Sequence, residues 1–187
     1  MTIEQRKKIE GGIFLVLFCF TVPVANWMIG HVGTVCAPNG PCLVPVAPGI
    51  LAPSGVLMIG AALVLRDLVQ RRLGPEIGIG AILVGAAISA AVAPPALVIA
   101  SAVAFLLSES ADFAIYTPLA RRRLLLAVVA SSMAGLVVDS IVFLWLAFGS
   151  LDFLPGQILG KTWMVLLAIP LVVYLRRRDE RLGLYPA

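Results

Sequence analysis

The chain has 187 residues, of which 60% are hydrophobic and 13% are charged, and its formal net charge is +4. A mean hydropathy of +1.03 excludes a soluble globular domain, whose surface needs more charged residues. The apolar segments are continuous rather than alternating, so their backbone hydrogen bonds are predicted to close within helices and not in a β-barrel. The composition indicates an all-α integral membrane protein with one domain over residues 1–187.

The 14 Lys and Arg residues do not scatter over a face, as phosphate binding would require, so no nucleic-acid partner is predicted. They lie in short clusters between apolar runs, and such clusters mark the cytoplasmic ends of transmembrane helices. Lys161 is the one basic residue outside the clusters. The clusters fall at 6–8, 66–72, 121–123 and 176–181. This pattern predicts a multi-pass protein of the cytoplasmic (inner) membrane with both termini cytoplasmic.

Six apolar runs are long enough to be transmembrane helices of about twenty residues. The stretch 31–49 contains no Lys or Arg and is rich in Pro and Gly, so it is predicted to be an external loop or a partly re-entrant segment. The pairs Gly74-Pro75 and Pro94-Pro95 are predicted to end helices and to form tight turns between them. The predicted helices span residues 11–30, 50–68, 77–93, 96–116, 124–148 and 157–175.

Acidic residues recur at helical spacing inside the fourth and fifth predicted helices. Glu109 and Asp112 are three residues apart, and Asp112 and Tyr116 are four apart, so one helix face presents two carboxyl groups and a phenol. Ser132 and Asp139 share a face of the next helix. Because charges are costly in hydrocarbon, by at least about 2.5 kcal/mol per carboxylate on insertion scales, these side chains are predicted to be functional and to face one cavity.

Each of these residues also has a purely structural interpretation. Serines and glycines in membrane helices often serve close packing, and Glu109 can pair with Arg66 at an inner helix end. The Arg66-Asp67 pair either locks the second helix or takes part in binding. A buried Asp139 must be protonated, paired or free for a ligand that donates hydrogen bonds. Lys161 either reaches the outer interface or pairs with a carboxylate.

The remaining polar residues bear on the loop and on the first helix. Cys36 and Cys42 flank a short external loop and are predicted to form a disulfide on the oxidising side of the membrane. Asn26 either contacts a ligand or compensates the helix break at Pro23. His31 is the only histidine, so no zinc cluster or nucleophile–base pair is expected, and no metal or other cofactor is predicted.

Three separated motifs follow one another along the chain. The first is Arg-Asp-Leu-Val-Gln at 66–70 followed by Leu-Gly at 73–74, the second is 108–119, and the third is 131–140 with Phe143 and the Ala-Phe-Gly of 147–149. In this order the motifs resemble those of the VUT family, the YhhQ-type queuosine-precursor transporters. The resemblance covers roughly residues 20–175. Members often carry Asn beside the serine of the third motif, where this chain has Ser132.

The resemblance implies import of a 7-deazapurine, such as 7-cyano- or 7-aminomethyl-7-deazaguanine, by a six-helix fold similar to the substrate-binding subunits of energy-coupling-factor vitamin transporters. The guanine edge suits a carboxylate acceptor, its carbonyl suits an amide or ammonium donor, and its flat face suits an aromatic ring. Our hypothesis is that Asp139 or Glu109 binds that edge. The candidate substrate-binding residues are Asp139, Glu109, Asp112, Asn26, Ser132, Lys161, Gln157, Trp163, Phe143, Arg66 and Asp67, with Trp27 as a further stacking ring.

The sequence contains no Gly-x-x-x-x-Gly-Lys loop, so the chain is not expected to hydrolyse ATP itself. It can be driven by a separate ATPase module, by a proton through Glu109 or Asp112, or by metabolic trapping, and a self-contained carrier is favoured. A homo-oligomer is a further alternative for its partners. The rival functions are a vitamin or nucleobase uptake subunit, a membrane thiol oxidoreductase using Cys36 and Cys42, and an assembly subunit, which would need no buried carboxylates.

Overall fold

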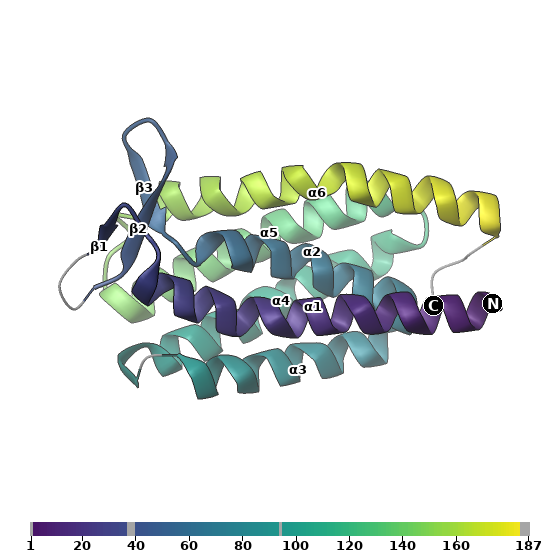
Figure 1. Ribbon diagram of the computed structural model, residues 1–187, viewed down its shortest axis with the longest axis horizontal. Helices are drawn as coiled ribbons and strands as arrows, with labels where there is room; N and C mark the ends of the chain where they lie inside the picture. Colours follow the sequence, from purple (N-terminus) through teal and green to yellow (C-terminus); the bar gives the residue numbers. More distant parts are fainter. Residues whose placement is uncertain (1, 37–39, 94, 184–187) are drawn as a thin grey trace.

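The computed structural model describes residues 2–36, 40–93 and 95–183. These residues form a bundle of six long α-helices with a small antiparallel sheet at one end (Figure 1). The helices are α1 (Ile3–His31), α2 (Val56–Leu73), α3 (Pro75–Val92), α4 (Val98–Ala120), α5 (Leu124–Phe148) and α6 (Leu154–Leu182), with the short 3-10 helix η1 (Pro95–Leu97) before α4.

The sheet connects α1 to α2 and has the strand order β1-β2-β3. Cys36 and Cys42 are directly opposite one another on β1 and β2 and form a disulfide. The Trp163 Nε1 of α6 donates to the Val46 carbonyl at 3.2 Å, so the sheet is attached to α6 as well as to its own flanking helices. The strands are β1 (Val35–Cys36), β2 (Cys42–Ala47) and β3 (Ile50–Pro53).

The two ends of the bundle differ in character, and we name them accordingly. The sheet end carries the three strands. The basic end is where α1 begins and α6 ends, and it carries the basic residues at 71–72, 121–123 and 176–178 (Figure 1).

The helix α2 lies at the centre of the bundle. It packs against each of the other five long helices, and none of its residues is exposed. The other five form a partial ring in which α1, α3, α4, α5 and α6 are successive neighbours. Because α2 contains four charged residues, its enclosure by protein keeps those charges away from lipid.

The outer surface of the ring is apolar, as lipid contact requires. Large hydrophobic side chains such as Phe20, Ile99 and Leu167 are 65–74% exposed. Five helices, α1, α3, α4, α5 and α6, are long and apolar enough to cross a membrane. The chain is therefore a multi-pass membrane protein. The helix α2 is not among these five because of its charged residues.

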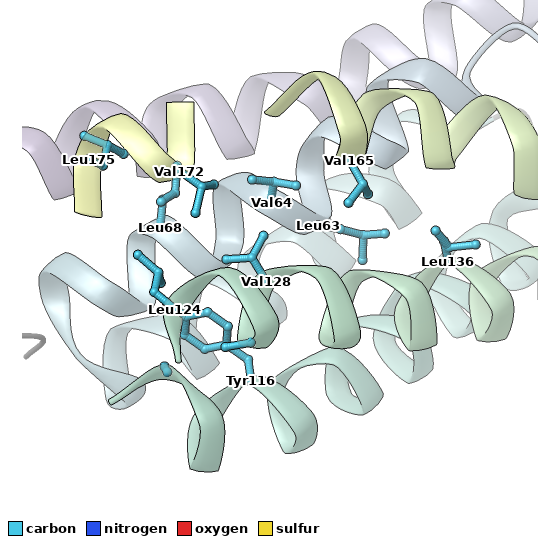
Figure 2. Close-up of a cluster of buried hydrophobic side chains, with 12 residues drawn as sticks. Leu63, Val64, Leu68, Tyr116, Leu124, Val128, Leu136, Val165, Val172 and Leu175 are labelled. Atoms are coloured by element: carbon cyan, nitrogen blue, oxygen red, sulfur yellow. The ribbon is translucent and has the colours of Figure 1, made fainter. Parts of the chain in front are cut away.

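The core between α2 and the α4, α5 and α6 helices consists of interlocking aliphatic side chains. Figure 2 shows Leu63, Val64 and Leu68 of α2 between the residues of α5 and those of α6. Tyr116 and Leu124 close this cluster toward the basic end (Figure 2). This packing fixes the rotation of α2, and hence the direction in which its charged residues point.

Several sequence-based boundaries need correction. The predicted helix 50–68 begins six residues later, since Ile50–Pro53 is strand β3 and a short apolar run does not distinguish a strand from a helix. The stretch 31–49, expected to be a loop, contains β1 and β2. Pro94, in the predicted outer turn, lies outside the described residues.

The predicted helices at the two ends of the chain are too short. The helix α1 begins at Ile3 instead of residue 11, and α6 runs from Leu154 to Leu182 instead of 157–175. Hydropathy marks only the apolar part of a helix, whereas helical hydrogen bonding continues into the charged segments. Similarly, α4 continues past Tyr116 to Ala120. The predicted range 124–148 coincides with α5. The next residue, Gly149, has the left-handed backbone conformation and caps the helix.

We predict that Gly60→Ala destabilises the protein and that Gly80→Ala does not. A Cβ at Gly60 would lie 2.8 Å from the Lys161 carbonyl oxygen, so α2 and α6 would have to separate. We expect a loss of about 1–3 kcal/mol. At Gly80 nothing lies within 4 Å of the added methyl group. Thermal unfolding of both purified variants in detergent tests this, and equal melting temperatures would contradict it.

We also predict that only one of the three cysteines reacts with an alkylating reagent before reduction. Cys19 is the free cysteine among the described residues, and Cys36 and Cys42 are paired. Intact-protein mass spectrometry should show one added alkyl group after denaturation alone and three after denaturation with reductant. Three groups without reductant would show that the disulfide is absent.

Candidate functional site

A pocket lies inside the half of the bundle nearest the sheet. Its lining residues bound about 590 Å³ of space not filled by atoms, and this figure includes space that is open to the outside. Every long helix contributes to its wall. The lining residues are Val22, Ala25, Asn26, Ile29, Pro53, Gly55, Val56, Ile59, Ser89, Leu97, Ser101, Phe105, Asp139, Phe143, Gln157 and Lys161.

Lys161 holds the polar side of this pocket together. Its Nζ donates to Asp139 Oδ2 at 2.6 Å, to Ser140 Oγ at 2.8 Å and to Gln157 Oε1 at 2.6 Å. An ammonium group has three N–H donors, so all of them are used. Lys161 is only 1% exposed, and its charge is balanced by Asp139. The pocket therefore offers an anionic ligand no uncommitted ammonium group from Lys161.

The other polar atoms on the wall are available to a ligand. Among the described residues, Asp139 Oδ1 and Gln157 Nε2 have no hydrogen-bond partner, which leaves one acceptor and one donor group. Asn26 donates to the Val22 carbonyl at 3.0 Å, so its side-chain oxygen is left as a second acceptor. Phe105 and Phe143 provide aromatic surface. The wall suits a flat molecule without an anionic group that both donates and accepts hydrogen bonds.

A second polar cluster surrounds Arg66, deeper in the bundle toward the basic end; we call it the Arg66 cluster. Arg66 Nε donates to Glu109 Oε2 at 3.1 Å, and Arg66 Nη2 donates to Asp112 Oδ1. Its Nη1 donates to Gln70 Oε1 at 2.9 Å and is 3.0 Å from Asp67 Oδ1. The guanidinium also lies over the Tyr116 ring, 5.7 Å from the centroid.

The α5 helix completes the Arg66 cluster. Ser131 Oγ donates to Asp67 Oδ2 at 3.0 Å. Gly135 allows α5 to approach closely, because a Cβ there would lie 3.2 Å from the Asp112 Cβ. All three carboxyl groups are buried. One guanidinium thus faces three carboxyl groups, and the negative charges exceed the positive by two when all are ionised.

A third cluster closes the basic end. Asp179 of α6 accepts two hydrogen bonds from Arg71, at 3.1 and 2.9 Å, and two from Arg72, at 2.9 and 2.8 Å. Glu10 of α1 pairs with Arg72 at 2.9 Å and with Arg178 at 2.6 Å. Salt bridges therefore link α1, α2 and α6 at this end.

The structure divides the predicted site residues between these places. The pocket contains five of them: Asn26, Asp139, Phe143, Gln157 and Lys161. The Arg66 cluster contains Arg66, Asp67, Glu109 and Asp112. Ser132 is buried and does not line the pocket. The expected single cavity shared by all three carboxylates is therefore wrong, because the Arg66 guanidinium holds two of them away from the pocket.

Neither of the two tryptophans predicted to stack on a ligand, Trp27 and Trp163, lines the pocket. Trp163 is 48% exposed and contacts the sheet through Val46. It follows Lys161 by two residues, about 200° around the helix, so the two side chains point in different directions. Trp27 is likewise exposed and stacks on His31 with the ring centroids 5.2 Å apart.

Sequence reasoning missed several participants. Ser89, Ser101 and Phe105 line the pocket, but single serines and aromatics in apolar helices carry no distinguishing signal. Asp179 was also missed, although an acidic residue inside the basic run 176–181 is a signal for pairing. For Lys161, the structure selects the carboxylate partner over the membrane interface.

Comparison with known proteins relates this architecture to transport. Residues 86–175 match the family described as "Putative vitamin uptake transporter". The matched segment includes Glu109, Asp112 and Asp139 together with Gln157 and Lys161, and it ends before Asp179. The match supports the resemblance to the VUT family. No curated protein and no solved structure matched the chain.

The ion pair of the pocket gives a stability prediction. Lys161→Met leaves Asp139 buried without its cation, which costs roughly 3–5 kcal/mol, so the melting temperature should fall clearly. The double variant Lys161→Met, Asp139→Asn removes both charges and should recover part of the loss. Thermal unfolding of the two variants and the parent checks this order. A double variant less stable than Lys161→Met would contradict it.

Proposed function

We propose that this chain is a VUT-family carrier, not an enzyme, and that it imports a queuosine precursor, 7-cyano- or 7-aminomethyl-7-deazaguanine, across the cytoplasmic membrane. The family match over 86–175 supports uptake of a small organic molecule. The observation that carries the proposal is the pocket, where a carboxylate oxygen, an amide donor and aromatic surface converge inside a membrane protein.

The pocket chemistry fits a guanine-like ring. The free Asp139 Oδ1 can accept from the ring N–H and the exocyclic amine, and the Gln157 Nε2 can donate to the ring carbonyl. Phe143 and Phe105 offer aromatic surface to the flat faces of the ring. Because Lys161 is committed to Asp139, the pocket disfavours a phosphorylated base. In this proposal the guanine edge binds to Asp139 and not to Glu109.

Membrane orientation follows from charge and from the disulfide. The basic end is assigned to the cytoplasm, because Lys and Arg in short loops stay inside. The Cys36–Cys42 disulfide of the sheet suits the oxidising, outer side. In this orientation the pocket lies in the outer half of the bundle and the Asp179 salt bridges close the cytoplasmic end. A carrier in this arrangement receives its substrate from outside.

The family description favours a second candidate, a vitamin uptake subunit that works with an ATPase module. The same pocket atoms can bind a flat vitamin ring that carries donors and acceptors. A direct binding comparison separates the two candidates. Thermal-shift titrations of the purified protein with both deazaguanines and with a panel of vitamins should show stabilisation by a deazaguanine, and stabilisation by a vitamin alone would favour the second candidate.

We predict that Asp139→Asn weakens deazaguanine binding by about 10- to 100-fold, since a hydrogen bond to a charged group contributes about 1.5–3 kcal/mol. Asp152→Asn is the matched control, because Asp152 is an exposed carboxyl residue outside the pocket. Titration calorimetry measures both affinities. Queuosine recovery in the tRNA of cells that lack both synthesis and uptake tests import. Equal affinities for Asp139→Asn and the parent would overturn the assignment of Asp139.

A further inference from the structure

The pocket does not use the Arg66 cluster, although that cluster is the most charged region of the bundle interior. Arg66 is fully buried and its guanidinium reaches Asp67, Glu109 and Asp112. The excess of two negative charges cannot persist at low dielectric without protons or bound cations. In the described part of the chain, no three His, Cys, Asp or Glu side chains converge as a metal site requires. One bound proton lowers this excess to a single negative charge, so we consider a proton as the compensating ion.

Unpartnered atoms locate this proton. Asp67 Oδ1 and Asp112 Oδ2 are both buried, and neither receives a hydrogen bond from the described residues. The two carboxyl groups are neighbours, because both contact the Arg66 guanidinium, Asp67 at Nη1 and Asp112 at Nη2. Two ionised carboxylates are only acceptors and repel, whereas a proton on one of them makes a hydrogen bond to the other. The buried hydroxyl of Tyr116 also has no partner there.

The partners of the two groups decide which one carries the proton. Asp112 accepts from Arg66 through Oδ1, so it is stabilised as the anion. Asp67 Oδ1 lies 3.0 Å from Arg66 Nη1 but receives no hydrogen bond from it, and Asp67 Oδ2 accepts from the neutral Ser131 hydroxyl. Asp67 is therefore the less stabilised anion of the two, and it is the group that carries the proton. The other charged and titratable groups that face this pair are Arg66 and Arg71 of α2, Glu109 and Tyr116 of α4, and, through Glu109, Asp139 of α5.

The cluster is electrostatically connected to the pocket. Glu109 shares the Arg66 guanidinium with Asp112. Asp112 and Gly135 are close neighbours across α4 and α5, and Glu109 and Asp139 each lie about one turn from this contact toward the sheet end, so their negative charges repel. A ligand that donates hydrogen bonds to Asp139 partly neutralises that carboxylate and so weakens its repulsion of Glu109. Binding in the pocket thus changes the charge that the Arg66 cluster experiences, and by linkage the proton changes the affinity of the pocket.

We propose that Asp67 and Asp112 bind one exchangeable proton between them, and that this proton is the coupling ion for import of the substrate. The coupling role rests on the proposed function, whereas the proton site does not. On binding, an O–H bond forms on Asp67 and a hydrogen bond forms to the Asp112 carboxylate. On release, the O–H bond breaks, the electron pair stays on Asp67, and the proton passes to water.

The proton site is tested without any substrate by infrared spectroscopy of the purified full-length protein. At neutral pH, the parent should show the C=O stretch of a protonated carboxyl group. Asp67→Asn should lose this band, and Asp152→Asn, which changes an exposed carboxyl, should keep it. The fold should survive in Asp67→Asn, because the Asn side chain reproduces the neutral, donating form of the acid. A band that persists unchanged in Asp67→Asn would overturn the proposal.

The coupling is tested in proteoliposomes with 7-aminomethyl-7-deazaguanine as the probe and an acidic exterior. One proton per substrate sustains up to about tenfold accumulation for a difference of one pH unit. The parent should accumulate the probe, and Asp67→Asn should only equilibrate it. Accumulation in the parent that does not depend on the pH difference would overturn the coupling role. If the probe is not transported at all, the proposed function fails, and the infrared band alone decides the proton site.

Discussion

The structure depends on the shielding of one charged helix from lipid. Arg66, Asp67, Arg71 and Arg72 all lie on α2, and a lone helix with these residues would be expensive to place in hydrocarbon. Five apolar helices surround α2, and its charges find partners on four of them, with Arg72 pairing with Glu10 of α1. Arg66 pairs with α4, Asp67 accepts from Ser131 of α5, and Arg71 pairs with Asp179 of α6. The polar interior of the bundle is thus a direct consequence of its central element.

The interior polar groups are arranged in levels along the bundle axis. The Lys161 and Asp139 pair lies beside the pocket, the Arg66 cluster lies deeper, and Asp179 lies at the basic end. Apolar packing separates these levels, as the cluster of Leu63, Val64 and Leu68 in Figure 2 illustrates. A molecule in the pocket therefore meets only the first level directly. Any influence on the deeper levels has to pass through charge or through movement of the helices.

Much of the helical framework was predictable, because apolar runs between basic clusters are a strong signal. The run from Leu124 to Phe148 lies between Arg123 and Gly149, and α5 occupies just that segment. The sheet was not predictable, since Ile50–Pro53 is too short for periodicity to separate strand from helix. For the candidate site, helical spacing identified the acidic residues Glu109, Asp112 and Asp139. It did not show that Arg66 binds Glu109 and Asp112 while Asp139 pairs with Lys161 in the pocket, because that depends on how α2 is rotated within the ring.

The first and last helices of the chain are the pair of ring neighbours with little direct contact. At one end they are joined through the sheet, where Ser54 donates to the Met28 carbonyl at 2.7 Å and Trp163 donates to Val46. At the other end they are joined by Glu10 and Arg178. Between these two connections α1 and α6 are held together mainly through α2, which packs against both. Separating α1 from α6 would break fewer direct contacts than separating any two successive helices of the ring.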